Sequence, residues 1–121
     1  MTSCISLFDV GREGETLIIS PTANLRELNF REIEEGMEKL FELLRSTPVR
    51  NVVLNFGKTD YFGSTALTLF IRLWKTVRAR DGRMALCNVS DYEREILAVA
   101  KFDSLWPIYP SVEEALAAVG R

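Results

Sequence analysis

After residue 29 the sequence alternates regularly between helix-like segments and short apolar runs. In the helix-like segments, apolar residues recur every three or four positions; these segments lie at 29–46, 64–80, 90–100 and 111–119. The short runs read as strands and lie at 51–56, 83–88 and 106–109. Strands that alternate with helices pair in parallel through right-handed crossovers. The pattern therefore predicts an α/β fold with a parallel sheet.

The first twenty residues follow a different pattern. Residues 5–10 and 16–20 read as two strands. Gly11 and Gly14 bracket the short turn expected between them, which is typical of an antiparallel hairpin. The predicted fold is therefore a mixed β-sheet, made of an N-terminal hairpin and then alternating strands and helices. We expect the helices to pack mainly on one face of this sheet.

Three of the predicted helices begin with a capping signal. A Ser or Asn followed three residues later by Glu can exchange hydrogen bonds with the backbone of the first helical turn. The pairs are Asn29 with Glu32, Ser90 with Glu93, and Ser111 with Glu114. These signals support the helix starts that the periodicity indicates.

Length and composition indicate one domain over residues 1–121, with 47% apolar residues and a formal charge of −2. No basic excess favours nucleic acid as a partner. The longest uncharged stretch, 61–71, is far shorter than the ~20 residues that span a bilayer. The N-terminus resembles no signal peptide. We therefore expect a cytoplasmic protein that does not insert into membranes, of unspecified oligomeric state.

The chain contains no histidine, which lowers the prospect of catalysis. Histidine is the usual general base near neutral pH and the commonest metal ligand. A glycine-rich phosphate loop is also missing, so we expect no enzyme, no metal and no cofactor.

Cys4 and Cys87 lie in separate strand-like runs, where they read as reduced core residues, with a disulfide or redox pair as the alternative.

Nearly the whole chain resembles the STAS domain, and three stretches carry the resemblance. The stretch Asn51–Thr68 is similar to the strand, loop and helix start of the family, whose usual motif is D-[ST]-[ST]-G-[LI]-G. The stretch Asp81–Ser90 is similar to the family's fourth strand, and Phe102–Leu116 is similar to its closing stretch. STAS domains include bacterial anti-sigma factor antagonists and the cytoplasmic tails of sulfate transporters.

The resemblance implies a regulatory protein whose site is the loop that leads into the helix at 64–80. In the antagonists, the first hydroxyl residue after the motif aspartate is phosphorylated, and Ser64 holds that position. Its unmodified form would bind an anti-sigma factor, itself a serine kinase, and phosphorylation would reverse the binding. The expected partner-binding residues are Asn24, Lys58, Asp60, Tyr61, Phe62, Gly63, Ser64 and Thr65.

The sequence departs from the family pattern around Ser64. Gly63 replaces the aspartate before the serine, and Asn24 replaces an acidic residue after the second strand. The glycines of the motif are replaced by Ala66 and Thr68. Asp60, four residues before Ser64, is the candidate that could replace the missing carboxylate.

Three alternatives remain at this point. Ser64 could be only the N-cap of its helix, with Thr65 as a weaker phosphoacceptor. The domain could be a degenerate STAS adaptor that binds its partner constitutively in a larger complex. It could also be a small nucleotide- or anion-binding protein that uses the N-terminus of the helix at 64–80.

Overall fold

The computed structural model describes residues 3–5 and 7–120, and the side chains from residue 5 on within these ranges. Within them the strands are β1 (Ser3–Ile5), β2 (Phe8–Glu13), β3 (Thr16–Pro21), β4 (Asn51–Asn55), β5 (Met84–Cys87) and β6 (Ile108–Tyr109). The helices are the 3₁₀ turn η1 (Glu27–Asn29), α1 (Phe30–Ser46), α2 (Ser64–Ala79), α3 (Asp91–Val99) and α4 (Val112–Ala118).

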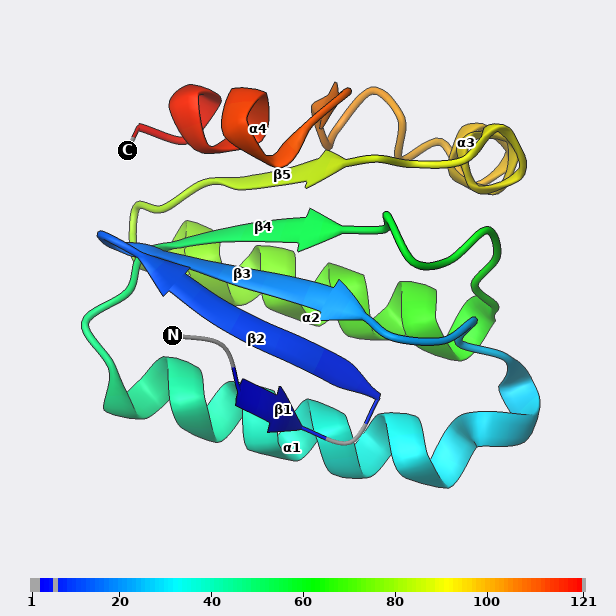
Figure 1. Cartoon of the computed structure of the whole chain (residues 1–121), viewed down its shortest axis with the longest axis horizontal. Helices are drawn as coiled ribbons and strands as arrows, with labels where there is room; N and C mark the ends of the chain where they lie inside the picture. The colour runs from blue at the N-terminus through cyan, green and yellow to red at the C-terminus, as the bar shows by residue number, and fades with distance from the viewer. Residues whose placement is uncertain (1–2, 6, 121) are drawn as a thin grey trace.

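The described strands form one mixed six-stranded sheet in which strand order follows chain order, β1-β2-β3-β4-β5-β6. The pairs β1–β2 and β2–β3 are antiparallel. The pairs β3–β4, β4–β5 and β5–β6 are parallel, each joined by a helix that crosses over (Figure 1). The predicted α/β fold and mixed sheet are confirmed.

The N-terminal hairpin differs from the prediction in two details. The run 5–10 is not one strand, because Ile5 pairs with Phe8 and the chain reverses between them. The turn between β2 and β3 is not at 11–14, because Gly11 and the two residues after it are part of β2. The chain turns at Gly14, whose positive φ of 60° suits a residue without a Cβ.

Two apolar layers hold the sheet between the helices. Val52 and Leu54 on β4 face the main core, which buries the inner sides of α1 and α2. Val53 points the opposite way because side chains alternate across a strand, and it packs with Ala115 and Leu116 of α4. In Figure 1, α4 accordingly lies at the top beside β5, apart from α1 at the bottom. Most helices thus share one face, and α4 covers the other.

Two of the three expected helix caps form. Ser90 and Glu93 make the reciprocal capping box of α3, and the Ser111 hydroxyl accepts a hydrogen bond from the Glu114 N–H at 3.2 Å. Asn29 makes no side-chain cap, so that prediction is wrong. The reason is that η1 runs directly into α1, which denies Asn29 the extended backbone of a capping residue.

The cysteine prediction is supported for Cys87 only. Cys87 is free and buried beneath α4, and burial raises the pKa of its thiol to about 11. The thiolate is therefore a negligible species at neutral pH, which makes this cysteine an inert core residue. The side chain of Cys4 lies outside the described residues.

Candidate functional site

The loops that follow β3, β4 and β5 meet at one edge of the sheet, because the carboxyl ends of parallel strands lie side by side. The loop of residues 57–63 is fastened to the segment after β3 by a parallel bridge between Leu25 and Phe62. The Gly63 N–H donates to the Leu25 carbonyl at 2.8 Å. This fastening brings segments far apart in sequence to the start of α2.

Asn24 and Asp60 form a two-way contact across these loops. The Asn24 amide donates to Asp60 Oδ1 at 2.8 Å, and the Asp60 N–H donates to Asn24 Oδ1 at 3.0 Å. The Ser90 hydroxyl also donates to the Asp60 carbonyl at 2.9 Å. Asp60 therefore holds the loops together and is engaged away from Ser64, so the expectation that it could replace the missing carboxylate beside Ser64 is not supported.

Lys58 lies on the exposed side of the loop, and Phe62 lies on its buried side. The Lys58 ammonium makes an ion pair with Asp9 of β2 at 2.8 Å, at the far rim of the loop. The side chain of Phe62 is only 1% exposed and packs against Phe56 and Phe70. The expectation that Phe62 contacts a partner is therefore corrected: Phe62 supports the loop from within the core.

Ser64 is the first residue of α2 and is exposed, while Thr65 is half-buried. The N-cap is Gly63, with an extended backbone, and no side-chain cap bond is made there. Ser64 therefore lies next to the N-cap, and the alternative in which it serves only as the N-cap is not supported. Its hydroxyl is free of a capping role and faces solvent at a helix end, where backbone N–H groups and the helix dipole favour negative charge.

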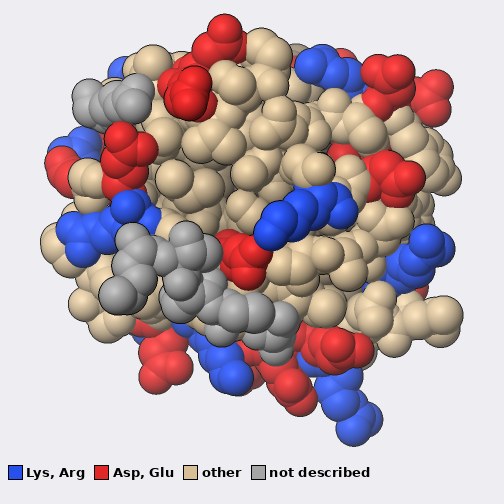
Figure 2. Space-filling view, in the orientation of Figure 1, with Lys and Arg blue, Asp and Glu red and all other residues tan. Residues whose placement is uncertain are grey.

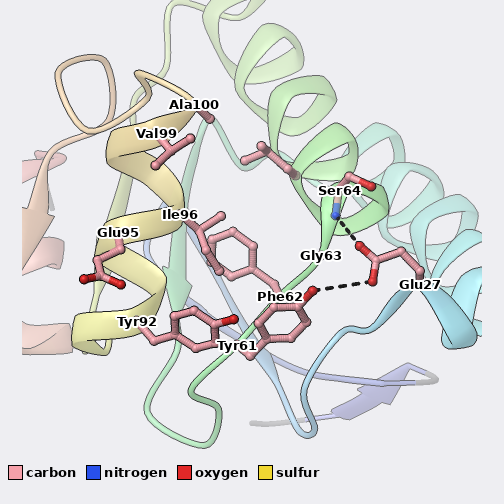
Figure 3. A pocket seen from close by; sticks show the side chains of 11 residues that line it. Glu27, Tyr61, Phe62, Gly63, Ser64, Tyr92, Glu95, Ile96, Val99 and Ala100 are labelled. Atoms are coloured by element: carbon pink, nitrogen blue, oxygen red, sulfur yellow. Dashed lines mark hydrogen bonds between the residues drawn. The ribbon is translucent and has the colours of Figure 1, made fainter.

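Glu27 supplies the carboxylate that the sequence pattern around Ser64 lacks. Its Oε1 accepts a hydrogen bond from the Ser64 N–H at 3.0 Å, and its Oε2 accepts one from the Tyr61 hydroxyl at 3.5 Å (Figure 3). The bond from the Ser64 N–H lowers the pKa of the Glu27 carboxyl below its usual value. Burial, followed by the Glu27 charge, raises the pKa of the Tyr61 hydroxyl. Sequence reasoning missed Glu27, and Gly63 was the signal that could have indicated it.

An apolar groove of about 490 Å³ opens between the start of α2 and α3. We call it the α2–α3 groove, and its apolar side chains include Tyr61, Leu67, Tyr92, Ile96 and Val99. Figure 3 shows Tyr61 and Tyr92 side by side at one end and Val99 at the other, and the two tyrosine ring centroids lie 5.5 Å apart.

Several apolar side chains at this edge are unusually exposed. Val99 is 85% exposed in the groove, Tyr92 is 55% exposed beside Tyr61, and Leu28, next to Glu27, is 95% exposed. Exposed apolar groups that cluster in a soluble fold mark surfaces that contact other molecules. The molecular face in Figure 2, by contrast, carries positive and negative side chains interspersed, with no broad region of one sign.

Within the part of the chain that the structure describes, no group of three or more His, Cys, Asp or Glu side chains could hold a metal ion. None of the described helices has the length and apolar character needed to cross a membrane.

Comparisons with known proteins agree with this fold. A model of the STAS domain matches residues 11–115. BtrV of Bordetella bronchiseptica, provisionally named an anti-sigma factor antagonist, is 35% identical over 69 residues, and these span 57% of this chain but only 60% of BtrV.

Solved structures share the same architecture. An anti-sigma-factor antagonist (STAS) domain protein from Planctomyces limnophilus is 31% identical, with a TM-score of 0.81, and the superposition covers 94% of this chain and 98% of that one. The Bacillus cell fate determinant SpoIIAA, in its phosphorylated form, is 21% identical with a TM-score of 0.71, over 93% of this chain and 98% of that one. The family match runs from β2 into α4, and this chain therefore belongs to the STAS domain family.

Proposed function

We propose that this protein is an anti-sigma factor antagonist. It binds an anti-sigma factor through the surface around Ser64, and phosphorylation of Ser64 weakens that binding. The observation that carries the proposal is the exposed position of Ser64 at the start of α2, beside the apolar α2–α3 groove. The names of BtrV and of the Planctomyces limnophilus protein support it. The protein would act in the cytoplasm as one non-enzymatic domain over residues 1–121.

The proposed contact surface combines an apolar centre with a polar rim. Tyr61, Tyr92 and Val99 would supply the centre, since tyrosines are common anchors of protein interfaces and apolar neighbours keep water away from them. Asn24, Lys58, Asp60, Gly63 and Thr65 would lie around it, and Phe62 would support the loop from below. This arrangement suits a partner with an apolar contact element, and the partner would be an anti-sigma factor with serine kinase activity.

Phosphorylation of Ser64 is expected to reduce the affinity for the purified anti-sigma factor by about tenfold or more. A phosphate adds roughly 1.5 to 2 negative charges at neutral pH. Glu27 and Glu95 already line the groove beside it, so a partner would have to cover three anions in one place. Isothermal titration calorimetry of the anti-sigma factor against unmodified and phosphorylated protein measures the difference.

Two neighbouring substitutions assign the effect to one hydroxyl. Ser64→Ala should keep the binding but accept no phosphate from the kinase, and Thr65→Ala should keep both. Equal affinity of the unmodified and phosphorylated forms would contradict the switch and would favour the adaptor alternative. That alternative draws support from Gly63 and Asn24, which replace both acidic residues of the family pattern.

Val99→Lys is expected to weaken binding of the anti-sigma factor by about tenfold or more without reducing the stability of the domain. Val99 is almost fully exposed at the last residue of α3, where a cation suits the helix dipole. The matched control is Leu105→Lys, which adds the same charge at an exposed apolar residue outside the groove. Equal loss of binding in both variants would place the contact elsewhere.

The third alternative, a nucleotide- or anion-binding protein, requires an empty helix end. The Glu27 carboxylate already accepts the Ser64 N–H at the start of α2, so an incoming anion would meet a negative charge there. This contact disfavours that function.

A further inference from the structure

The start of α2 is already occupied by an anion from elsewhere in the chain. Glu27 belongs to η1, and its carboxylate accepts the N–H of Ser64, which lies 37 residues further on. A carboxylate at the first turn of a helix does electrostatically what a bound phosphate does: it accepts a free backbone N–H and meets the positive end of the dipole. Glu27 is therefore a resident anionic cap on the helix that begins with the candidate phosphoacceptor.

Gly63 is the residue that makes room for this cap. A Cβ at position 63 would overlap the carboxylate of Glu27, at Oε1 above all. The backbone of Gly63 is extended, with φ −100° and ψ −171°, which other residues adopt freely. Glycine here thus leaves the space that the Glu27 carboxylate occupies, and a larger residue would push that exposed carboxylate aside. The aspartate that the family carries at this position would expel Glu27, so Gly63 and Glu27 form a matched pair.

A phosphate on Ser64 would compete with Glu27 for the same helix end. Figure 3 shows the Ser64 hydroxyl oxygen and the Glu27 carboxylate on the same side of the start of α2. Glu27 forms no ion pair among the described residues: Arg26 lies over the Tyr61 ring, and Lys58 is paired with Asp9. Two anions at one helix end repel, and the covalently attached phosphate cannot leave.

Glu27 can leave because it is exposed and is held there by hydrogen bonds to Ser64 and Tyr61. Its departure would release the segment of residues 26–30, which carries two exposed apolar side chains, Leu28 and Phe30. The segment would remain anchored on one side at Leu25, which bridges to Phe62. Movement would therefore be confined to η1 and the start of α1.

We propose that phosphorylation of Ser64 displaces Glu27 from the start of α2 and thereby moves the segment of residues 26–30 with Leu28. The proposal rests on the proposed function only in assuming that Ser64 is the modified residue. A partner would then sense the modification twice, through the added charge and through the altered apolar surface at η1.

The first experiment tests the pair in the unmodified protein by a double-mutant cycle of Gly63→Ala and Glu27→Ala. In the native background, Gly63→Ala should raise the unfolding equilibrium constant about two- to fivefold more than it does in the Glu27→Ala background. The intrinsic preference of an N-cap for Gly over Ala is present in both backgrounds and cancels. Glu34→Ala, which removes an exposed acid of α1, is the control background. If Gly63→Ala changed stability equally in all three backgrounds, the proposed coupling of Gly63 and Glu27 would be wrong.

The second experiment installs phosphoserine at position 64 chemically and needs no partner. In the native background the NMR resonances of the backbone amides of residues 26–30 should shift on phosphorylation. The Ser64 N–H should also change its hydrogen-bond acceptor. In Glu27→Gln, which removes the charge, residues 26–30 should shift far less. Unchanged resonances of residues 26–30 in the native background would overturn the displacement. If these resonances shift while anti-sigma factor affinity stays equal, the displacement stands and the proposed function fails.

Discussion

Phe62→Ala is expected to cost about 3–5 kcal/mol of unfolding free energy. Phe62 is fully enclosed, with ring centroids 5.4 Å from Phe56 and 5.1 Å from Phe70. Removing its ring leaves a cavity beneath the loop of residues 57–63 and loosens the bridge to Leu25. Urea denaturation followed by circular dichroism measures the loss, and the loop should lose hydrogen-exchange protection with it.

The adjacent residue provides the control. Tyr61→Ala removes a ring of similar size that is half-buried at the surface, together with a long hydrogen bond to Glu27. We expect this variant to lose only about 1 kcal/mol of stability while losing affinity for the partner. An equal loss of stability in the two variants would contradict the assignment of one side chain to the core and its neighbour to the surface.

Glu93→Ala is expected to cost roughly 2–4 kcal/mol of unfolding free energy. Glu93 is fully buried, and its carboxylate accepts the Ser90 N–H at 3.0 Å and the Thr59 hydroxyl at 2.7 Å. The variant would lose the capping box of α3, leave the partly buried Ser90 N–H without its acceptor, and leave the Thr59 hydroxyl only its longer contact to the Phe56 carbonyl at 3.4 Å. Thermal unfolding gives the stability, and the exchange rate of the Ser90 amide reports the cap directly.

The position of Glu93 connects α3 to the loop of residues 57–63, so its loss should also loosen the site. Glu95→Ala removes an exposed carboxylate from the same helix and should change stability by no more than about 0.5 kcal/mol. Glu93→Gln, which retains an oxygen acceptor, should fall between the two. A Glu93→Ala variant as stable as Glu95→Ala would show that the buried contacts contribute nothing.

The sequence predicted the parts of this fold that depend on local pattern. Alternation after residue 29 predicted the parallel strands, and the spacing of Ser90 and Glu93 predicted a cap that forms in full. It placed the start of α2 at Ser64, which is correct. These features depend on residues a few positions apart, and such signals hold where the neighbouring structure leaves them free, as it does at Ser90 but not at Asn29.

The features it missed depend on contacts that the local pattern does not show. The run 5–10 is mostly apolar and reads as one strand, and only the pairing of Ile5 with Phe8 reveals that it contains a reversal. Glu27 reaches Ser64 because the bridge from Leu25 to Phe62 fixes their segments together. An exposed glutamate in a short turn has no local signature; Gly63 indicates that something occupies the space beside it, but only the structure identifies Glu27.

The order of the strands has a consequence for folding during synthesis. Each strand pairs with the strand that precedes it along the chain, so during synthesis every new strand finds its neighbour already made. The sheet can grow from the hairpin outward without a strand waiting for a later partner. The apolar side formed by Val53, Ala85 and Cys87 is covered by α4, which follows all the described strands along the chain. A nascent chain that stalls before α4 would therefore expose an apolar face of the sheet, and this face is where we expect chaperones to bind.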